Sequence, residues 1–126
     1  MTAIVNAVVH LLVAIMENIA AKTSTFNGTA FDTQDYEGVL GVTLFVGAVS
    51  GTSPTLDGKL QSSTTSGGTY ADIPNATFTQ VTAANALQKV NIDLNACDRY
   101  IRFVGTIAGT SPSFTMGVTA SGIKKY

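Results

Sequence analysis

The sequence predicts an all-β, single-domain antiparallel β-sandwich of about eight short strands, jelly-roll-like in its connections. Its 126 residues suffice for one hydrophobic core. Apolar and polar residues alternate with a period of two in several stretches, which is typical of strands with one buried face. Clusters of Gly, Ser, Pro and Asn separate these stretches at roughly the spacing found in sandwiches. Some connections are long, which favours a jelly roll over an immunoglobulin-type sheet pair.

One stretch of the chain occurs twice, as FVGAVSGTSP at residues 45–54 and FVGTIAGTSP at residues 103–112. Each copy ends an apolar run, and another alternating run follows it. We interpret each copy as a strand, a tight hairpin turn and a second strand, with the two hairpins at equivalent corners of the two sheets. Glycine tolerates positive φ, and proline lacks the amide donor of a strand's first residue. The predicted turn motif comprises Gly51, Thr52, Ser53, Pro54, Gly109, Thr110, Ser111 and Pro112.

The N-terminal residues 2–20 carry two conflicting patterns. Apolar residues at helical spacing indicate an amphipathic helix, whereas a dense β-branched and aliphatic run indicates a buried strand. We favour an apolar arm over residues 1–7 and a strand near residues 8–16, because every other element reads as a strand. The predicted division is therefore an arm at 1–7 and a β-sandwich domain at 8–126. The run lacks the basic start of a signal peptide and is too short and polar for a membrane span.

The remaining elements follow in order along the chain. A turn at residues 32–38 precedes a strand at 39–49 that is apolar on both faces. Its second face, with Thr43, Phe45, Gly47 and Val49, must be covered by the N-terminal segment or by another subunit. Further strands are expected at residues 55–63, 78–81, 87–94, 99–108 and 113–122, and a possible short one at 29–31.

The low charge of the chain limits the classes of partner. Charged residues make up 12% of the sequence and the net charge is −1, so we expect neither nucleic acid nor a membrane as partner. A surface so poor in charge suits a protein that partners cover. The single cysteine, Cys97, excludes an intrachain disulfide and is expected to be a small buried residue.

No residue pattern indicates a reaction or a cofactor. His10 is the only histidine and is expected within a half-buried strand. Asp32, Asp35 and Glu37 could hold a calcium ion, but a turn with side-chain to backbone bonds explains them equally well. Nucleophile elbows, phosphate-binding glycine loops and Cys-x-x-Cys pairs are absent from the sequence. We therefore expect no enzymatic activity, no metal and no cofactor.

Several motifs resemble those of the capsid decoration, or cement, proteins of tailed bacteriophages. The similarity extends over about residues 28–120 and rests on turn-and-strand signatures. The motifs are DTQDYEG at 32–38, GTSPTLDGKLQSS at 51–63, FTQVTAA at 78–84, RYIR at 99–102 and GTSPSF at 109–114.

The resemblance implies a β-sandwich virion protein, made in the host cytoplasm, that binds the outer surface of an assembled capsid and stabilises it. Its partner would be the major capsid protein, and it would form a homo-oligomer, with a trimer favoured. We assign the partner interface to the apolar arm at residues 1–7 and to the strand at residues 39–49, which is apolar on both faces. The interface residues would be Ile4, Val5, Val8, Val9, Phe45 and Val49.

The alternative function is a lectin-like β-sandwich module that binds a host-surface glycan or receptor. It requires exposed aromatic rings gathered on one concave face. The candidates are Tyr36, Tyr70 and Tyr100. Packing in the core or at its rim is the favoured interpretation of all three.

Overall fold

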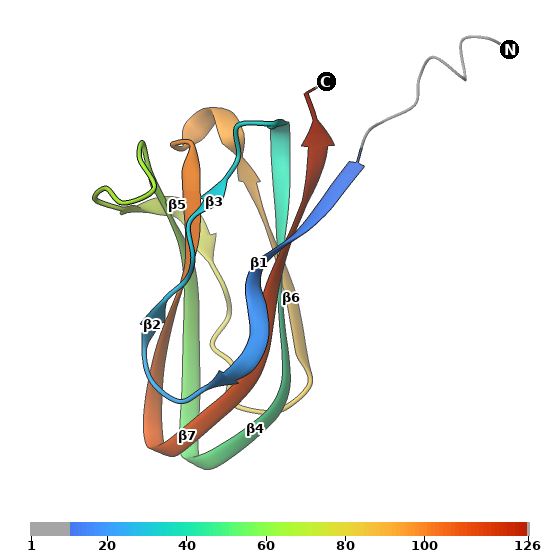
Figure 1. The fold of residues 1–126 in the computed structure, drawn as a ribbon. Coiled ribbons are helices and arrows are strands. Elements are labelled where there is room, and N and C mark those ends of the chain that lie inside the picture. The colour runs from blue at the N-terminus through green and yellow to red at the C-terminus, as the bar shows by residue number, and fades with distance from the viewer. Residues whose placement is uncertain (1–10, 126) are drawn as a thin grey trace, which may run out of the picture.

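The computed structural model describes residues 11–125 (Figure 1). These residues contain strands, one 3-10 turn and no α-helix, so the predicted all-β class is confirmed. Seven strands are present where about eight were expected. Two of them each run through two predicted strands, those at 26–27 and 71–77 were not predicted, and the predicted strand at 78–81 forms only an isolated bridge between Val81 and Leu56. The elements are β1 (Leu11–Lys22), β2 (Phe26–Asn27), β3 (Phe31–Asp32), β4 (Tyr36–Ser63), β5 (Ala71–Thr77), β6 (Ala86–Asp93), η1 (Leu94–Ala96) and β7 (Tyr100–Lys124).

Two long strands, β4 and β7, belong to both layers of the sandwich. The first half of β4 pairs with the second half of β7, and the second half of β4 pairs with the first half of β7. β1 and β6 flank the former pair, giving the first sheet with the order β1-β7-β4-β6. β2, β3 and β5 flank the latter pair, giving the second sheet. All pairings are antiparallel, as the sequence predicts.

The repeated Gly-Thr-Ser-Pro segments form corners where β4 and β7 bend from one sheet to the other. Thr52 pairs with Thr110, so the two copies lie side by side at the lower end of Figure 1. The strands before and after each corner do not pair with each other, so the predicted hairpins are wrong. A hairpin and a corner share the same apolar–turn–apolar pattern, and only long-range pairing separates them. The positive φ angles are 106° at Gly51, 49° at Ser53, 120° at Gly109 and 48° at Ser111.

The core lies between the two sheets and follows the predicted alternation. In the first sheet the inward residues of β4 and β7 are almost completely buried. In the second sheet Leu56, Leu60, Ile101 and Phe103 oppose them. The inward residues of the first sheet are Leu40, Val42, Leu44, Val46, Phe114, Met116, Val118 and Ala120.

The N-terminal stretch is a strand where the structure describes it. β1 pairs along its length with β7, from Leu11 opposite Ile123 to Lys22 opposite Phe114. The prediction of a strand is therefore confirmed over a helix, although β1 extends to Lys22, further than expected. The predicted arm and His10 lie outside the described residues. Within residues 11–125 no helix has the length and apolar character needed to cross a bilayer.

The strict alternation predicted for residues 39–49 fails after Val46. The pairing of β4 with β7 shifts register between Val46 and Val49, which marks a bulge. Val49 then pairs with Phe114 and packs against the core. Phe45 instead lies on the outer face of the first sheet, so the expectation that Phe45 and Val49 share a face is wrong.

Candidate interaction surface

Exposed apolar side chains gather on the outer face of the first sheet. The described residues include seven large hydrophobic residues that are between 42% and 74% exposed, and all seven belong to strands of this sheet. Isolated exposed apolar residues are ordinary, but a contiguous group marks a contact surface. We call this outer surface the apolar face. The seven residues are Leu11, Val13, Ile15, Ile19, Val39, Leu87 and Ile123.

The strand register arranges the apolar face into a ridge and a lane. Branched aliphatic side chains project from the edge strand β1 and form the ridge. In the middle of the two central strands, small or hydroxyl-bearing residues form the lane beside it, namely Gly41, Thr43, Thr119 and Ser121. One row across the sheet is Val13, Ser121, Gly41 and Asn91, and the next is Ile15, Thr119, Thr43 and Lys89.

Phe45 lies at the lower end of the apolar face. It pairs with Leu87 on one side and with Gly117 on the other. A Cβ built on Gly117 would lie 2.5 Å from Cζ of Phe45, so the ring rests directly on the glycine. Glycine therefore leaves room for the ring to lie flat on the sheet. Phe45 is the one residue of the predicted interface that the structure places on this face.

The outer face of the second sheet is polar. The Arg102 guanidinium stacks 4.1 Å from the Tyr70 ring centroid and donates to Oε1 of Gln61 at 3.0 and 2.8 Å. Gln61 donates to Asp72 at 2.8 Å, and Lys59 forms an ion pair with Asp72 at 3.0 Å. Hydrogen bonds from Gln61 and Lys59 lower the pKa of Asp72. The outer face of the second sheet is therefore suited to contact with solvent, and the outer face of the first sheet is suited to contact with a protein.

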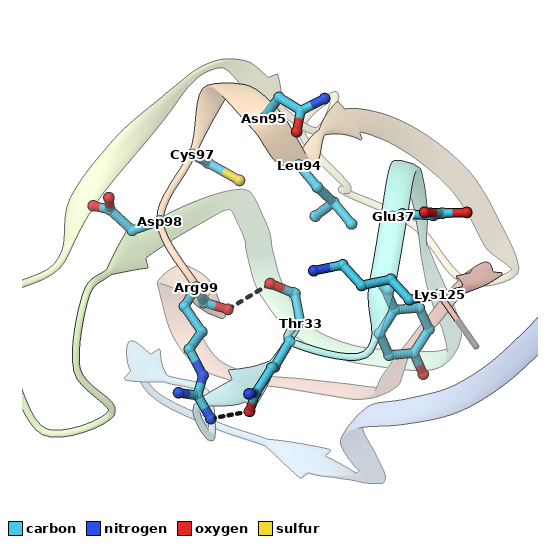
Figure 2. A pocket seen from close by; sticks show the side chains of 10 residues that line it. Thr33, Glu37, Leu94, Asn95, Cys97, Asp98, Arg99 and Lys125 are labelled. Carbon is cyan, nitrogen blue, oxygen red and sulfur yellow. Dashed lines mark hydrogen bonds between the residues drawn. The ribbon is translucent and has the colours of Figure 1, made fainter.

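A pocket of about 280 Å³ opens at one end of the sandwich (Figure 2). Its wall includes Arg99, which donates to the two carboxylate oxygens of Asp32 at 2.9 and 2.8 Å. The hydrogen bond from Arg99 is the main cause that lowers the pKa of Asp32. Asp32 also accepts from the backbone amide of Gln34 at 2.9 Å, which confirms the expected turn bond. Among residues 11–125, no three His, Cys, Asp or Glu side chains are placed to hold a metal ion.

Cys97 lines the same pocket and is half-buried. Burial is the largest cause that raises the pKa of its thiol, and the nearby carboxylates of Asp98 and Asp93 raise it further. The thiolate is the reactive form of cysteine, so this environment suppresses reactivity. Cys97 therefore packs against the core, although it is half-buried rather than buried as the sequence predicts.

We expect Cys97 to alkylate severalfold more slowly in the folded protein than in urea. Its raised pKa reduces the thiolate fraction at a given pH, so the folded rate should rise only at higher pH than the unfolded rate. The measurement is the rate of iodoacetamide labelling between pH 7 and 10, followed by mass. A folded rate equal to or above the unfolded rate would contradict the effect of burial.

The three candidate tyrosines, Tyr36, Tyr70 and Tyr100, do not form a sugar-binding platform in the described part of the chain. Tyr36 is buried, with its ring centroid 5.6 Å from that of Phe31. Arg102 covers the ring of Tyr70, and Arg99 lies 4.9 Å from the ring centroid of Tyr100. The rings that a glycan would stack on are therefore buried or occupied by guanidinium groups, and nothing favours the lectin-like alternative.

Comparison with known proteins identifies the fold but no family. No family model matches the sequence, and no curated protein matches it. The chain is similar in fold to a prophage-derived protein. This is the SPBc2 prophage-derived protein YomS, with a TM-score of 0.57 and 14% identity, covering 94% of this chain and 96% of that one. A chain of infectious bursal disease virus (Gx strain) has a TM-score of 0.59 and 10% identity; the match covers 93% of this chain but 33% of the viral one.

The apolar face was only partly foreseeable. Four residues of the predicted interface, Ile4, Val5, Val8 and Val9, lie outside the described residues. The exposure of Leu87 could have been predicted, because Leu87 is two residues from the outward Lys89 in an alternating strand and so points to the same face. The ridge on β1 could not have been predicted. Both faces of the β1 sequence are apolar, and the position of β1 in the sheet depends on its pairing with β7.

Proposed function

We propose that the chain is a structural virion protein that binds the outer surface of an assembled phage capsid and stabilises it. The observation that carries the proposal is the apolar face, in a sandwich whose opposite face is a polar network. A cement protein needs such a contact surface and no reacting groups. Similarity in fold to a prophage-derived protein and to a viral chain supports the same class of function.

The stabilising effect follows from linkage. A protein that binds the assembled shell better than its separate subunits shifts the equilibrium toward assembly. Several linked copies strengthen the contact further, so a homo-oligomer is part of the proposal. The major capsid protein is the proposed partner. Its contacts would come from the arm at residues 1–7, from Val8 and Val9, and from the apolar face with Phe45.

We expect the full chain to bind undecorated capsids and to raise their melting temperature by several degrees. A chain lacking residues 1–7 should bind at least about tenfold more weakly, because it loses the apolar contacts of Ile4 and Val5. Co-sedimentation gives the binding, and calorimetry gives the capsid melting temperature.

The truncated chain serves as its own folding control, since its melting temperature should match that of the full chain. If the full chain neither binds capsids nor shifts their melting, the proposed function is wrong. If both chains bind equally, the function stands and the arm has no part in it.

A further inference from the structure

The strand β2 ends in an asparagine followed by a glycine, Asn27-Gly28, the one such pair in the sequence. Asn27 is exposed and pairs with Val104 of β7. Asparagine is a thermolabile residue, because the carbonyl carbon of its side chain is open to attack by the backbone nitrogen of the next residue. A following glycine has no Cβ to hinder that attack, so the most reactive asparagine of the chain lies at β2.

The fold requires the glycine of this pair. A Cβ built on Gly28 would lie 2.8 Å from the carbonyl oxygen and 3.4 Å from the nitrogen of Phe103, and both are backbone atoms of β7. The close approach lets the amide of Gly28 donate to the carbonyl oxygen of Phe103 at 2.6 Å. A larger residue at this position would push the chain away from β7. The contact that holds the end of β2 therefore also keeps the reactive pair in the sequence.

The pairing of β2 with β7 blocks the reaction in the closed structure. Loss of the side-chain amide passes through a five-membered imide ring, in which Cβ of Asn27 and the nitrogen of Gly28 are eclipsed about the bond from Cα to the carbonyl carbon. An extended backbone holds these two atoms far from that arrangement. The proton that the nitrogen must lose is also engaged in the hydrogen bond to Phe103. Both obstacles disappear when Asn27 and Gly28 leave β7.

Few contacts hold β2 in place. It has two residues, and among the described residues it pairs with β7 alone. The hydroxyl of Thr25 accepts from the amide of Ile107 at 3.0 Å and donates to its carbonyl oxygen at 3.4 Å. The half-buried ring of Phe26 packs against Phe103, with ring centroids 5.9 Å apart. Short edge segments with so few contacts open without unfolding the rest of a protein.

We propose that Asn27 is a site of spontaneous deamidation that the local opening of β2 controls. When β2 opens, the backbone nitrogen of Gly28 attacks Cγ of Asn27. The new N–Cγ bond forms, the bond from Cγ to Nδ2 breaks, and ammonia leaves with the proton of the Gly28 amide. Water then opens the imide ring at one of its two carbonyl carbons. Attack at Cγ gives aspartate, and attack at the main-chain carbon gives isoaspartate, in which the chain continues through the side chain.

Isoaspartate at position 27 is expected to release β2 permanently. It adds one carbon to the main chain between Phe26 and Gly28. A strand of two residues then cannot place the ring of Phe26 on Gly105 and the amide of Gly28 on Phe103 at the same time. Aspartate leaves the length of the backbone unchanged, and its side chain remains exposed, so β2 should still close. The two products therefore separate the effect of the added charge from that of the added carbon.

The test follows deamidation of the full chain by peptide mass at mildly alkaline pH. Asn27 should react at least about tenfold more slowly in the folded protein than in urea, because the reaction waits for β2 to open. Phe26→Ala and Thr25→Val remove contacts of β2 and should each speed the folded-state reaction severalfold. Phe45→Ala is the matched control, because it removes the same ring from the first sheet and should leave the rate unchanged. Thermal melting shows whether each variant is folded.

Three results would overturn the proposal. A rate in the folded protein equal to that in urea would mean that β2 does not protect Asn27. Variants of Phe26 and Thr25 that react no faster than Phe45→Ala would exclude the opening of β2 as the route. The isoaspartate form, purified from aged protein, should melt below the Asn27→Asp variant, and equal melting temperatures would mean that β2 closes again. These measurements involve no capsid, so they are independent of the proposed function.

Discussion

Replacing Gly51 with alanine is expected to destabilise the protein by about 3 kcal/mol or more. Gly51 has a φ of 106°, a region that residues with a Cβ rarely adopt. The added Cβ would lie 2.6 Å from the carbonyl oxygen of Ser111 and 2.9 Å from Cα of Pro112, both backbone atoms of the paired corner. Neither strand can yield without breaking the corner. Urea unfolding of the purified variant measures the loss.

Gly67→Ala is the matched control. Gly67 lies in the loop after β4, where an added Cβ meets no atom within 4 Å. Its free energy of unfolding should stay within about 0.5 kcal/mol of wild type. A Gly51→Ala variant that loses less than about 1 kcal/mol would mean that the corner relaxes, and the backbone argument would fail.

Replacing Phe103 with alanine is expected to cost about 4 kcal/mol, from lost burial and the cavity that remains. Phe103 is 1% exposed, with ring centroids of Phe26 and Phe78 at 5.9 and 5.6 Å. Its ring also rests on Gly58, where a Cβ would lie 2.7 Å from Cζ of Phe103. The aromatic cluster fills the second half of the core and cannot close over the gap. Urea unfolding again provides the measurement.

Phe45→Ala removes the same side chain from the apolar face and isolates the effect of burial. Because Phe45 is half-buried on the surface, its loss should cost about 1 kcal/mol. Equal costs at Phe45 and Phe103 would contradict the burial of Phe103 in the core.

Alternation predicts the interior of this fold well. Phe114, Met116, Val118 and Ala120 are inward as the period of two requires, and so are Leu56 and Leu60. These positions depend only on local sequence, because adjacent residues of a strand point to opposite faces. Where a bulge adds a residue, as between Val46 and Val49, the following residues change face, and the sequence pattern does not indicate this change.

The corners and the apolar face depend on long-range pairing, which the sequence does not state. The Gly-Thr-Ser-Pro repeats mark a change of direction, but not whether the following strand returns beside its predecessor or passes to the other sheet. Likewise, Leu11 and Ile15 are exposed because the register of β1 with β7 places them on the uncovered outer face of the first sheet. A two-sided apolar strand predicts a contact without saying which side makes it.

The sharing of β4 and β7 between both sheets has a consequence for synthesis and folding. The central pair of the first sheet joins Tyr36 to Lys124 at its far end, and that of the second joins Ser63 to Tyr100. A nascent chain therefore cannot complete the second sheet before residues 100–108 have left the ribosome, nor the first sheet before residues 113–124 have done so. Pairing so distant in sequence must close long loops before contacts offset their entropy, which makes such folds slow to form. Until then the two apolar halves of β4 lack their partner β7, and the chain is prone to aggregation.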